Sequence, residues 1–123
     1  MILSFEDEKP IYLQLAEGIE DAIISGAFPE DTQIPSTTEI SLQYKINPAT
    51  ALKGINLLVD HNIIYKKRGV GMFVATGAVE KLLEKRKVSF YESYIMSLIE
   101  EANKLQISKK EIVSMIERGM ENE

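Results

Sequence analysis

The chain has 123 residues, of which 45% are hydrophobic and 27% charged, as in one soluble globular domain with at most a short extension. With no cysteine and one histidine, it excludes disulfide bonds, zinc–cysteine sites, thiol catalysis and histidine-based metal clusters. Its net charge is −5, it has no apolar run near the ~20 residues that span a bilayer, and its acidic N-terminus differs from a secretion signal, so we expect a cytoplasmic protein with no membrane partner.

The charge is unevenly distributed along the sequence. Residues 1–39 contain nine acidic residues and one lysine, a net charge of −8, whereas residues 40–77 contain five basic residues and one acidic residue, a net charge of +4. Because exposed charges interact over only about 8 Å at physiological salt, the basic region can bind phosphate groups despite the acidic total.

The first predicted helix covers residues 10–25, PIYLQLAEGIEDAIIS. Its apolar side chains recur at helical spacing: Ile11, Leu15, Ile19, Ala22 and Ile23. Pro10 suits a first-turn position, and Gly26 is a typical C-terminal stop. A loop rich in helix breakers, AFPEDTQIP, follows.

A short second helix is predicted to begin at Ser36 and to end near Tyr44. Ser36 and Glu39 have the spacing of a capping box, in which each side chain bonds the backbone amide of the other residue. Ile40 and Leu42 would supply the apolar contacts of this helix.

A third helix is predicted from Asn47-Pro48 to about Asp60. Asn47 is a good cap, and the missing N–H of Pro48 would have had no partner in the first turn. Its apolar stripe consists of Ala51, Leu52, Ile55, Leu58 and Val59. Gly54 costs this helix ~1 kcal/mol relative to alanine, which indicates close approach of another backbone or a tolerated cost.

Two short strands, Ile63–Lys66 and Met72–Ala75, are predicted around KRGVG. Two helices joined by the tight turn YKIN and followed by a β-hairpin form a winged helix-turn-helix. We therefore expect an α+β, mostly α fold, in which residues 1–76 form a DNA-binding winged helix-turn-helix domain.

Residues 77–123 are predicted to form a helical dimerisation tail. From Val79 to Leu105 apolar residues recur at steps of three and four, and a helix ~40 Å long cannot bury such a stripe against so small a domain. Ser108 and Glu111 form a second capping-box pair, which opens a last helix. Its predicted inner face consists of Ile112, Val113 and Ile116. The predicted interface of the homodimer consists of Leu83, Phe90, Tyr91, Tyr94, Ile95, Leu98 and Ile99.

The stretch around Gly69 and Gly71 allows a nucleotide loop or a hairpin tip. A dinucleotide fingerprint needs a third glycine and a following helix, and a Walker loop needs Gly-Lys-Ser/Thr; the chain has neither here. Lys66, Lys67 and Arg68 stand beside a turn whose glycines let a DNA backbone approach. The hairpin interpretation therefore predicts DNA contacts, with a solvated charge run as the alternative.

Four residues on the early turns of the third helix lie off its apolar stripe: Asn47, Ala49, Thr50 and Lys53. Small polar residues with one long cation suit a major groove, although Asn47 could serve only as a cap and Thr50 could only face solvent. Ser36 and Thr37 could hold a phosphate oxygen at a helix N-terminus, and Lys45 is a further candidate cation.

No catalytic triad, paired-carboxylate site or metal-ligand cluster can be assembled from the sequence, so we expect neither an enzyme nor a cofactor. The acidic side chains near the N-terminus could bind a hard cation, but they are more typical of a solvated helix face.

A set of ordered motifs runs along the chain: PIYLQL (10–15), IISG (23–26), IPSTTEIS (34–41), INPAT with Lys53 (46–53), LLVDHNIIYKKRGVGMFV (57–74) and a tail of about 45 residues. Together they resemble the GntR family of bacterial transcription regulators, and within it the YtrA-like subfamily, whose short two-helix tail serves dimerisation. The resemblance implies a homodimer on an inverted repeat in double-stranded DNA, usually a repressor and often one of neighbouring transporter operons.

The family's DNA contacts, carried over to matching positions, fall at Ser36, Thr38, Asn47, Ala49, Thr50, Lys53, Lys67, Arg68 and Gly69. Thr38 stands where the family commonly has an arginine, and Pro48 replaces an arginine of other branches. A threonine is too short for the bidentate guanine contact, which is worth ~1–3 kcal/mol of discrimination. The resemblance therefore implies weakened specificity or its transfer to Lys53 and the wing, while phosphate contacts maintain affinity.

Two alternatives remain open. One is a winged-helix protein-interaction module whose DNA face has decayed, for which Thr38 would be the sign. The other is a small-molecule-binding or enzymatic domain that uses the glycines of residues 69–71. A small-molecule effector of a DNA-binding protein could sit between the tail and the winged helix or across the dimer seam.

Overall fold

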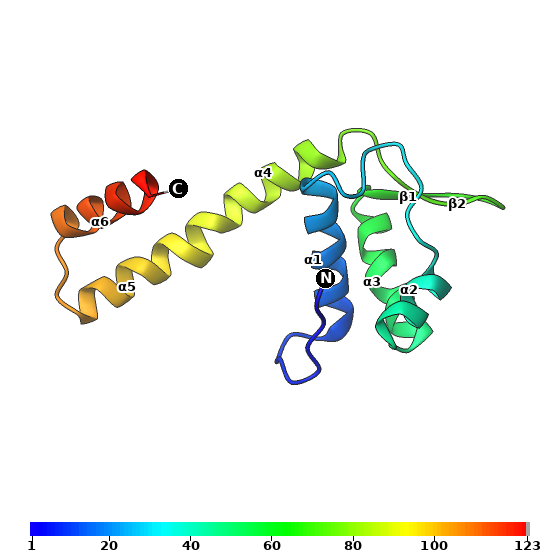
Figure 1. Ribbon diagram of the computed structural model, residues 1–123, viewed down its shortest axis with the longest axis horizontal. Coiled ribbons are helices and arrows are strands. Elements are labelled where there is room, and N and C mark those ends of the chain that lie inside the picture. Colours follow the sequence, from blue (N-terminus) through cyan, green and yellow to red (C-terminus); the bar gives the residue numbers. More distant parts are fainter. Residues whose placement is uncertain (123) are drawn as a thin grey trace. The chain divides into compact units, whose positions relative to one another are not determined.

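The computed structural model describes residues 1–122 and divides into two compact units, Met1–Glu84 and Lys85–Glu123 (Figure 1). The first unit contains α1 (Ile11–Ile24), α2 (Thr37–Tyr44), α3 (Pro48–Asp60), β1 (Ile64–Lys67), β2 (Gly71–Val74) and the first turns of α4 (Ala78–Phe90). The chain then continues through a π-helical segment (Tyr91–Ile95), α5 (Met96–Lys104) and α6 (Lys109–Glu121). The predicted fold, mostly helical with one small sheet, is confirmed.

The three helices and the hairpin of the first unit enclose one apolar core. Its largest fully buried side chains are Leu15, Ile19, Ile23, Ile55, Leu58, Ile64, Val74 and Leu82. α1 ends at Ile24, and Gly26 follows with a φ of +87°, as expected for a helix stop. The core therefore fixes α1, α3 and the hairpin as one body from which the exposed side chains project.

At Gly54 the backbone of α3 approaches α1 closely. A Cβ atom on Gly54 would lie 2.7 Å from the backbone carbonyl oxygen of Tyr12 and 3.2 Å from a methyl carbon of Leu15. Any side chain at this position would force the two backbones apart. The predicted close approach of another backbone at Gly54 is confirmed.

Both predicted caps of the helix-turn-helix are present. The hydroxyl of Ser36 accepts a hydrogen bond from the Glu39 amide, and the Glu39 carboxylate accepts one from the Ser36 amide, each 3.1 Å long. The Asn47 side chain accepts a 2.8 Å bond from the Ala49 amide at the start of α3. Between the helices, Lys45 adopts a left-handed conformation with a φ of 54°, which reverses the chain in a short turn.

The hairpin pairs β1 and β2 in antiparallel register, with Ile64 opposite Val74 and Lys67 opposite Gly71. β1 begins one residue later than predicted, and β2 begins one residue earlier. The amide of Ile63 donates to the Leu58 carbonyl and the Ile63 carbonyl accepts the Ala75 amide, and β1 itself starts at Ile64. Because Lys67 pairs with Gly71, β2 starts one residue before the predicted Met72.

The loop before α2 adds a third line of pairing to β2. The amide of Asp31 donates to the Val74 carbonyl (2.8 Å), the amide of Val74 to the Thr32 carbonyl (3.0 Å), and the amide of Ile34 to the Met72 carbonyl (2.9 Å). The wing is thus hydrogen-bonded to the body of the first unit along one whole strand.

The start of α4 is held by Glu30, whose two carboxylate oxygens accept the amides of Gly77 (2.8 Å) and Val79 (3.0 Å). α4 contributes the buried Ala78 and Leu82 to the first unit, which extends to Glu84. The functional boundary predicted between residues 76 and 77 stays a prediction. None of the helices within residues 1–122 combines the length and the apolar character that crossing a bilayer demands.

The helix predicted from Val79 to Leu105 is present but contains a widened turn. In the segment Tyr91–Ile95 the hydrogen bonding is π-helical, and the Met96 amide bonds the Tyr91 carbonyl. α6 begins at the predicted cap, where the Ser108 hydroxyl accepts the Glu111 amide at 3.2 Å. From residue 85 to 122, Ala102 is the one apolar residue that is buried, so the apolar stripe of this unit lies open.

Candidate nucleic-acid interface

The wing presents its cations at an exposed tip. The turn Arg68–Val70 joins the strands, and Gly69 adopts a φ of +77° there, which glycine reaches without strain. Lys66, Lys67 and Arg68 are all exposed. The Lys67 ammonium lies 5.4 Å from the centre of the Phe73 ring, so this cation lies beside the strand.

One groove joins the wing to the start of α2. It is lined by Gln33, Ile34, Ser36, Thr37, Thr38, Glu39, Lys66, Lys67, Arg68, Gly69, Val70, Gly71 and Met72. The structure therefore brings together the predicted contacts of the α2 N-terminus and of the wing, although the two segments are about thirty residues apart in the sequence. Hydroxyl groups and helix-end amides on one wall and cations on the other form a surface that suits a phosphate group.

The capping box decides which groups of the α2 N-terminus remain as donors. The Ser36 amide already bonds Glu39, so it is not available to a phosphate. The Ser36 hydroxyl accepts one bond and keeps its own proton to donate. The amides of Thr37 and Thr38 lie in the first helical turn, where no intrahelical carbonyl can accept them.

The predicted contacts on α3 lie outside this groove. Asn47, Ala49 and Lys53 are exposed, and Thr50 is half-buried. The Lys53 ammonium lies 4.2 Å from the centre of the Tyr12 ring, over α1. Lys45, in the turn, is exposed. These placements leave the polar start of α3 accessible, and its DNA contacts stay a prediction.

Two residues of this region carry interactions that the sequence did not indicate. The Gln33 side-chain amide donates a 2.9 Å hydrogen bond to the carbonyl of Val70 at the tip of the wing. Tyr12 carries the ring that supports Lys53. Both contacts join distant segments, so no local motif could have revealed them.

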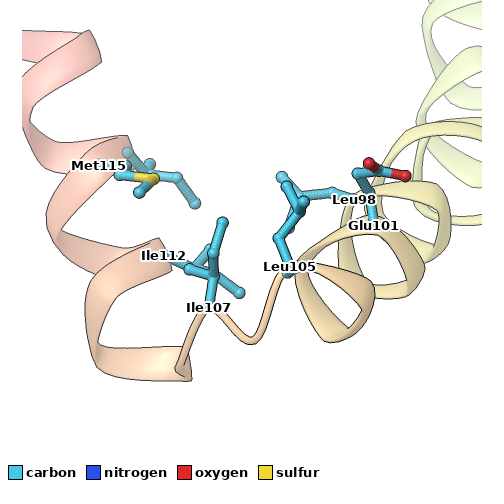
Figure 2. A pocket seen from close by; sticks show the side chains of 8 residues that line it. Leu98, Glu101, Leu105, Ile107, Ile112 and Met115 are labelled. Atoms are coloured by element: carbon cyan, nitrogen blue, oxygen red, sulfur yellow. The ribbon is translucent and has the colours of Figure 1, made fainter.

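The second unit has an apolar groove between α5 and α6. Figure 2 shows Leu98 of α5 and Leu105, which directly follows α5, facing Ile107, Ile112 and Met115 across it. Ala102, Ile116 and the edge residue Glu101 complete the lining. Ile112 and Ile116 thus lie on the predicted inner face of α6, whereas the predicted Val113 is exposed and lies outside the groove.

The predicted interface residues are mostly open to solvent in the single chain. Those that are exposed are Leu83, Phe90, Tyr91, Tyr94, Leu98 and Ile99. Ile95 is half-buried. The rings of Phe90 and Tyr94 lie 5.6 Å apart, so they form one aromatic surface beside the π-helical segment.

The model of the bacterial regulatory proteins of the gntR family matches residues 11–74, which covers the helix-turn-helix and the wing. The chain belongs to the GntR family. A solved GntR-family regulator from Bacteroides thetaiotaomicron is 35% identical and aligns over 91% of this chain and 97% of its own, with a TM-score of 0.76. This match includes the tail as well as the winged helix.

Two further GntR relatives are informative. The transcriptional repressor YtrA of Bacillus subtilis is 26% identical over 120 residues, which cover 93% of this chain and 92% of YtrA. This full-length match supports the YtrA-like subfamily. The DNA-binding domain of AraR, solved in complex with an operator, is 33% identical and aligns over 61% of this chain and 90% of its own, with a TM-score of 0.54. The chain is a DNA-binding transcriptional regulator, and these relatives are regulators rather than enzymes.

Proposed function

We propose that this GntR-family protein is a cytoplasmic, non-enzymatic repressor that binds an inverted-repeat operator as a homodimer. The observation that carries the proposal is the groove in which the α2 N-terminus faces Lys66, Lys67 and Arg68 of the wing. Residues 1–76 would bind DNA, and residues 77–123 would join the two copies. Two relatives support this function: YtrA is named as a transcriptional repressor, and the AraR DNA-binding domain was solved in complex with an operator.

The surface of the first unit suggests how it meets DNA. The exposed start of α3, with Asn47, Ala49, Thr50 and Lys53, would enter the major groove and contact base edges. Ser36, Thr37 and Thr38, with Lys45, would contact the backbone beside it. The wing, with Lys66, Lys67, Arg68, Gly69 and Gly71, would lie along the backbone or the adjacent minor groove. Because the Thr38 side chain is too short for a bidentate guanine contact, α3 and the wing would discriminate between bases.

The tail supports a homodimer because a single copy leaves its apolar stripe exposed. Leu98 and Ile99 of α5 are each more than a third exposed, and Tyr91 and Tyr94 more than half. Contiguous apolar surface of this kind marks an interface between protein chains. Two-fold symmetry would place the half-site centres about one helical turn, ~10 bp, apart.

In vitro selection of DNA sites followed by gel shifts would test the proposal. We expect selection to yield a palindromic sequence whose complex weakens steeply with salt. Replacing Lys67→Ala together with Arg68→Ala should reduce the slope of log Kd against log salt by about 1.8, because each lost phosphate contact removes ~0.9. The matched control is Lys109→Ala with Arg118→Ala, which removes the same charges from exposed positions of α6.

Three results would count against the proposal. An unchanged complex in the wing variant would show that the wing does not contact DNA. A selected site without two-fold symmetry would rule out the symmetric dimer. A stable dimer that binds no DNA at low salt would favour a protein-interaction module instead.

A further inference from the structure

Gln33 links the loop before α2 to the tip of the wing. Its backbone lies opposite Phe73 of β2 in an isolated bridge. Its side chain then continues along the hairpin and donates a 2.9 Å bond to the carbonyl of Val70. Val70 closes the turn, because its own amide donates to the Lys67 carbonyl at 3.0 Å. One side chain of the body therefore holds the turn that carries Arg68 and Gly69.

Gly71 leaves the space that this link requires. A Cβ atom on Gly71 would clash with the Gln33 side-chain nitrogen and would lie 3.3 Å from the Gln33 side-chain Cδ. Gly71 also has a φ of +143°, a conformation that other residues rarely adopt. The position thus has two reasons to be glycine, and one of them is the presence of Gln33.

We propose that Gln33 is a positioning residue for DNA binding, which holds the wing tip so that its cations meet the same backbone as the α2 N-terminus. This inference rests on the proposed function. The backbone bonds from the loop before α2 reach β2 only as far as Met72, and a turn that became ordered only when DNA binds would reduce the affinity. The bond from Gln33 orders the tip during folding, so this cost no longer falls on binding.

The same contact places both walls of the groove in a fixed relation. Gln33 lies three residues before Ser36, and its side chain ends at Val70, two residues after Arg68. The backbone bonds from residues 31–34 to β2 fix the strand itself, and the Gln33 side chain extends this hold to the turn beyond Met72. A residue without a donor at position 33 would keep the wing cations in the sequence, but the turn beside them would no longer be held in position.

The variant that tests this inference is Gln33→Met, which keeps the length of the side chain and removes the donor. Kd would be measured by fluorescence anisotropy on a labelled duplex of random sequence at several salt concentrations, because backbone contacts do not depend on sequence. We expect binding about 3–10-fold weaker, as for one lost hydrogen bond, and a salt slope smaller by about 0.9. Gln33→Ala should also weaken binding and reduce the salt slope. Circular dichroism should show that both variants are folded.

A background without wing cations separates positioning from direct contact. In a Lys66→Ala, Lys67→Ala, Arg68→Ala background, Gln33→Met should cause no further loss, because no wing cation remains to be positioned. A persistent loss in that background would mean that Gln33 touches DNA itself, and would overturn the inference. Wild-type affinity and salt slope in Gln33→Met would overturn it as well. If the wild-type chain bound no DNA, the proposed function itself would fail, which is a different outcome.

The geometry of the link can be checked without DNA. Gly71→Ala should lower the thermal unfolding midpoint in the wild-type chain through both backbone strain and the clash with Gln33. In a Gln33→Ala background only the strain remains, so the same substitution should lower the midpoint less. Equal shifts in the two backgrounds would contradict the packing of Gln33 against Gly71.

Discussion

The ammonium nitrogen of Lys53 lies 4.2 Å from the centre of the Tyr12 ring, so a cation of α3 rests on an aromatic side chain of α1. The proposed recognition helix is therefore tied to α1 at two places, by this pair and by the close crossing at Gly54. Tyr12 keeps the Lys53 side chain against the body, on the exposed side of α3.

A double-mutant cycle on Tyr12→Leu and Lys53→Met should give a coupling of about 0.5–1 kcal/mol, the range of cation–π pairs at exposed sites. Urea unfolding would measure the four free energies. Tyr12→Phe is the control, because it keeps the ring and should preserve the coupling. Strictly additive effects would show that the ammonium does not rest on the ring in solution.

Gly54→Ala should destabilise the chain by about 1–3 kcal/mol, since the new Cβ atom would lie 2.7 Å from the Tyr12 carbonyl oxygen. The strain of this contact therefore outweighs the ~1 kcal/mol that alanine gains over glycine in a helix. Gly119→Ala in α6 is the matched control, because its Cβ atom would meet no other atom within 4 Å. Thermal unfolding should show a lower midpoint for the first variant and an equal or higher one for the second.

Glu30→Ala should lower the stability of the first unit by about 1–2 kcal/mol, because it leaves the amides of Gly77 and Val79 without their carboxylate partner. Amide hydrogen exchange should increase at these two positions in particular. Glu117→Ala removes an exposed carboxylate from α6 and serves as the control. Unchanged protection at Val79 in Glu30→Ala would contradict the capping role.

Leu98→Glu should convert the proposed dimer to monomers, because it places a charge on the apolar surface beside the α5–α6 groove. An unpaired charge in an interface costs about 3 kcal/mol or more, which raises the dimer Kd more than ~100-fold. Sedimentation equilibrium would measure this change. Leu42→Glu, on an α2 side chain that is 75% exposed, should leave the dimer intact. A dimer unaffected by Leu98→Glu would place the interface elsewhere.

Features with a local cause could be predicted from the sequence. The caps at Ser36, Asn47 and Ser108 depend on residues at most three positions apart, and all three were found where the sequence placed them. Gly54 was informative because a glycine inside a helix carries a cost that a close contact explains. The winged helix-turn-helix followed from these elements and their order.

Features that join distant segments could not be predicted. Gln33 meets Val70 across 37 positions, and Glu30 meets Gly77 across 47, so neither pair leaves a local pattern. The π-helical turn at Tyr91–Ile95 could not be predicted for another reason. Apolar residues at steps of three and four fit a regular helix, and one widened turn changes that spacing too little to be seen.

The crossing of α1 and α3 at Gly54 has a consequence for how such a regulator can diversify. α3 meets α1 through the Gly54 backbone and through buried side chains such as Ile55 and Leu58, so its position depends mainly on its inner face. Exposed residues such as Ala49 can change while the helix keeps its position, whereas Asn47 caps the helix and Lys53 rests on Tyr12. If α3 reads the operator as proposed, new operator preferences would arise on its outer face while the crossing at Gly54 stays unchanged.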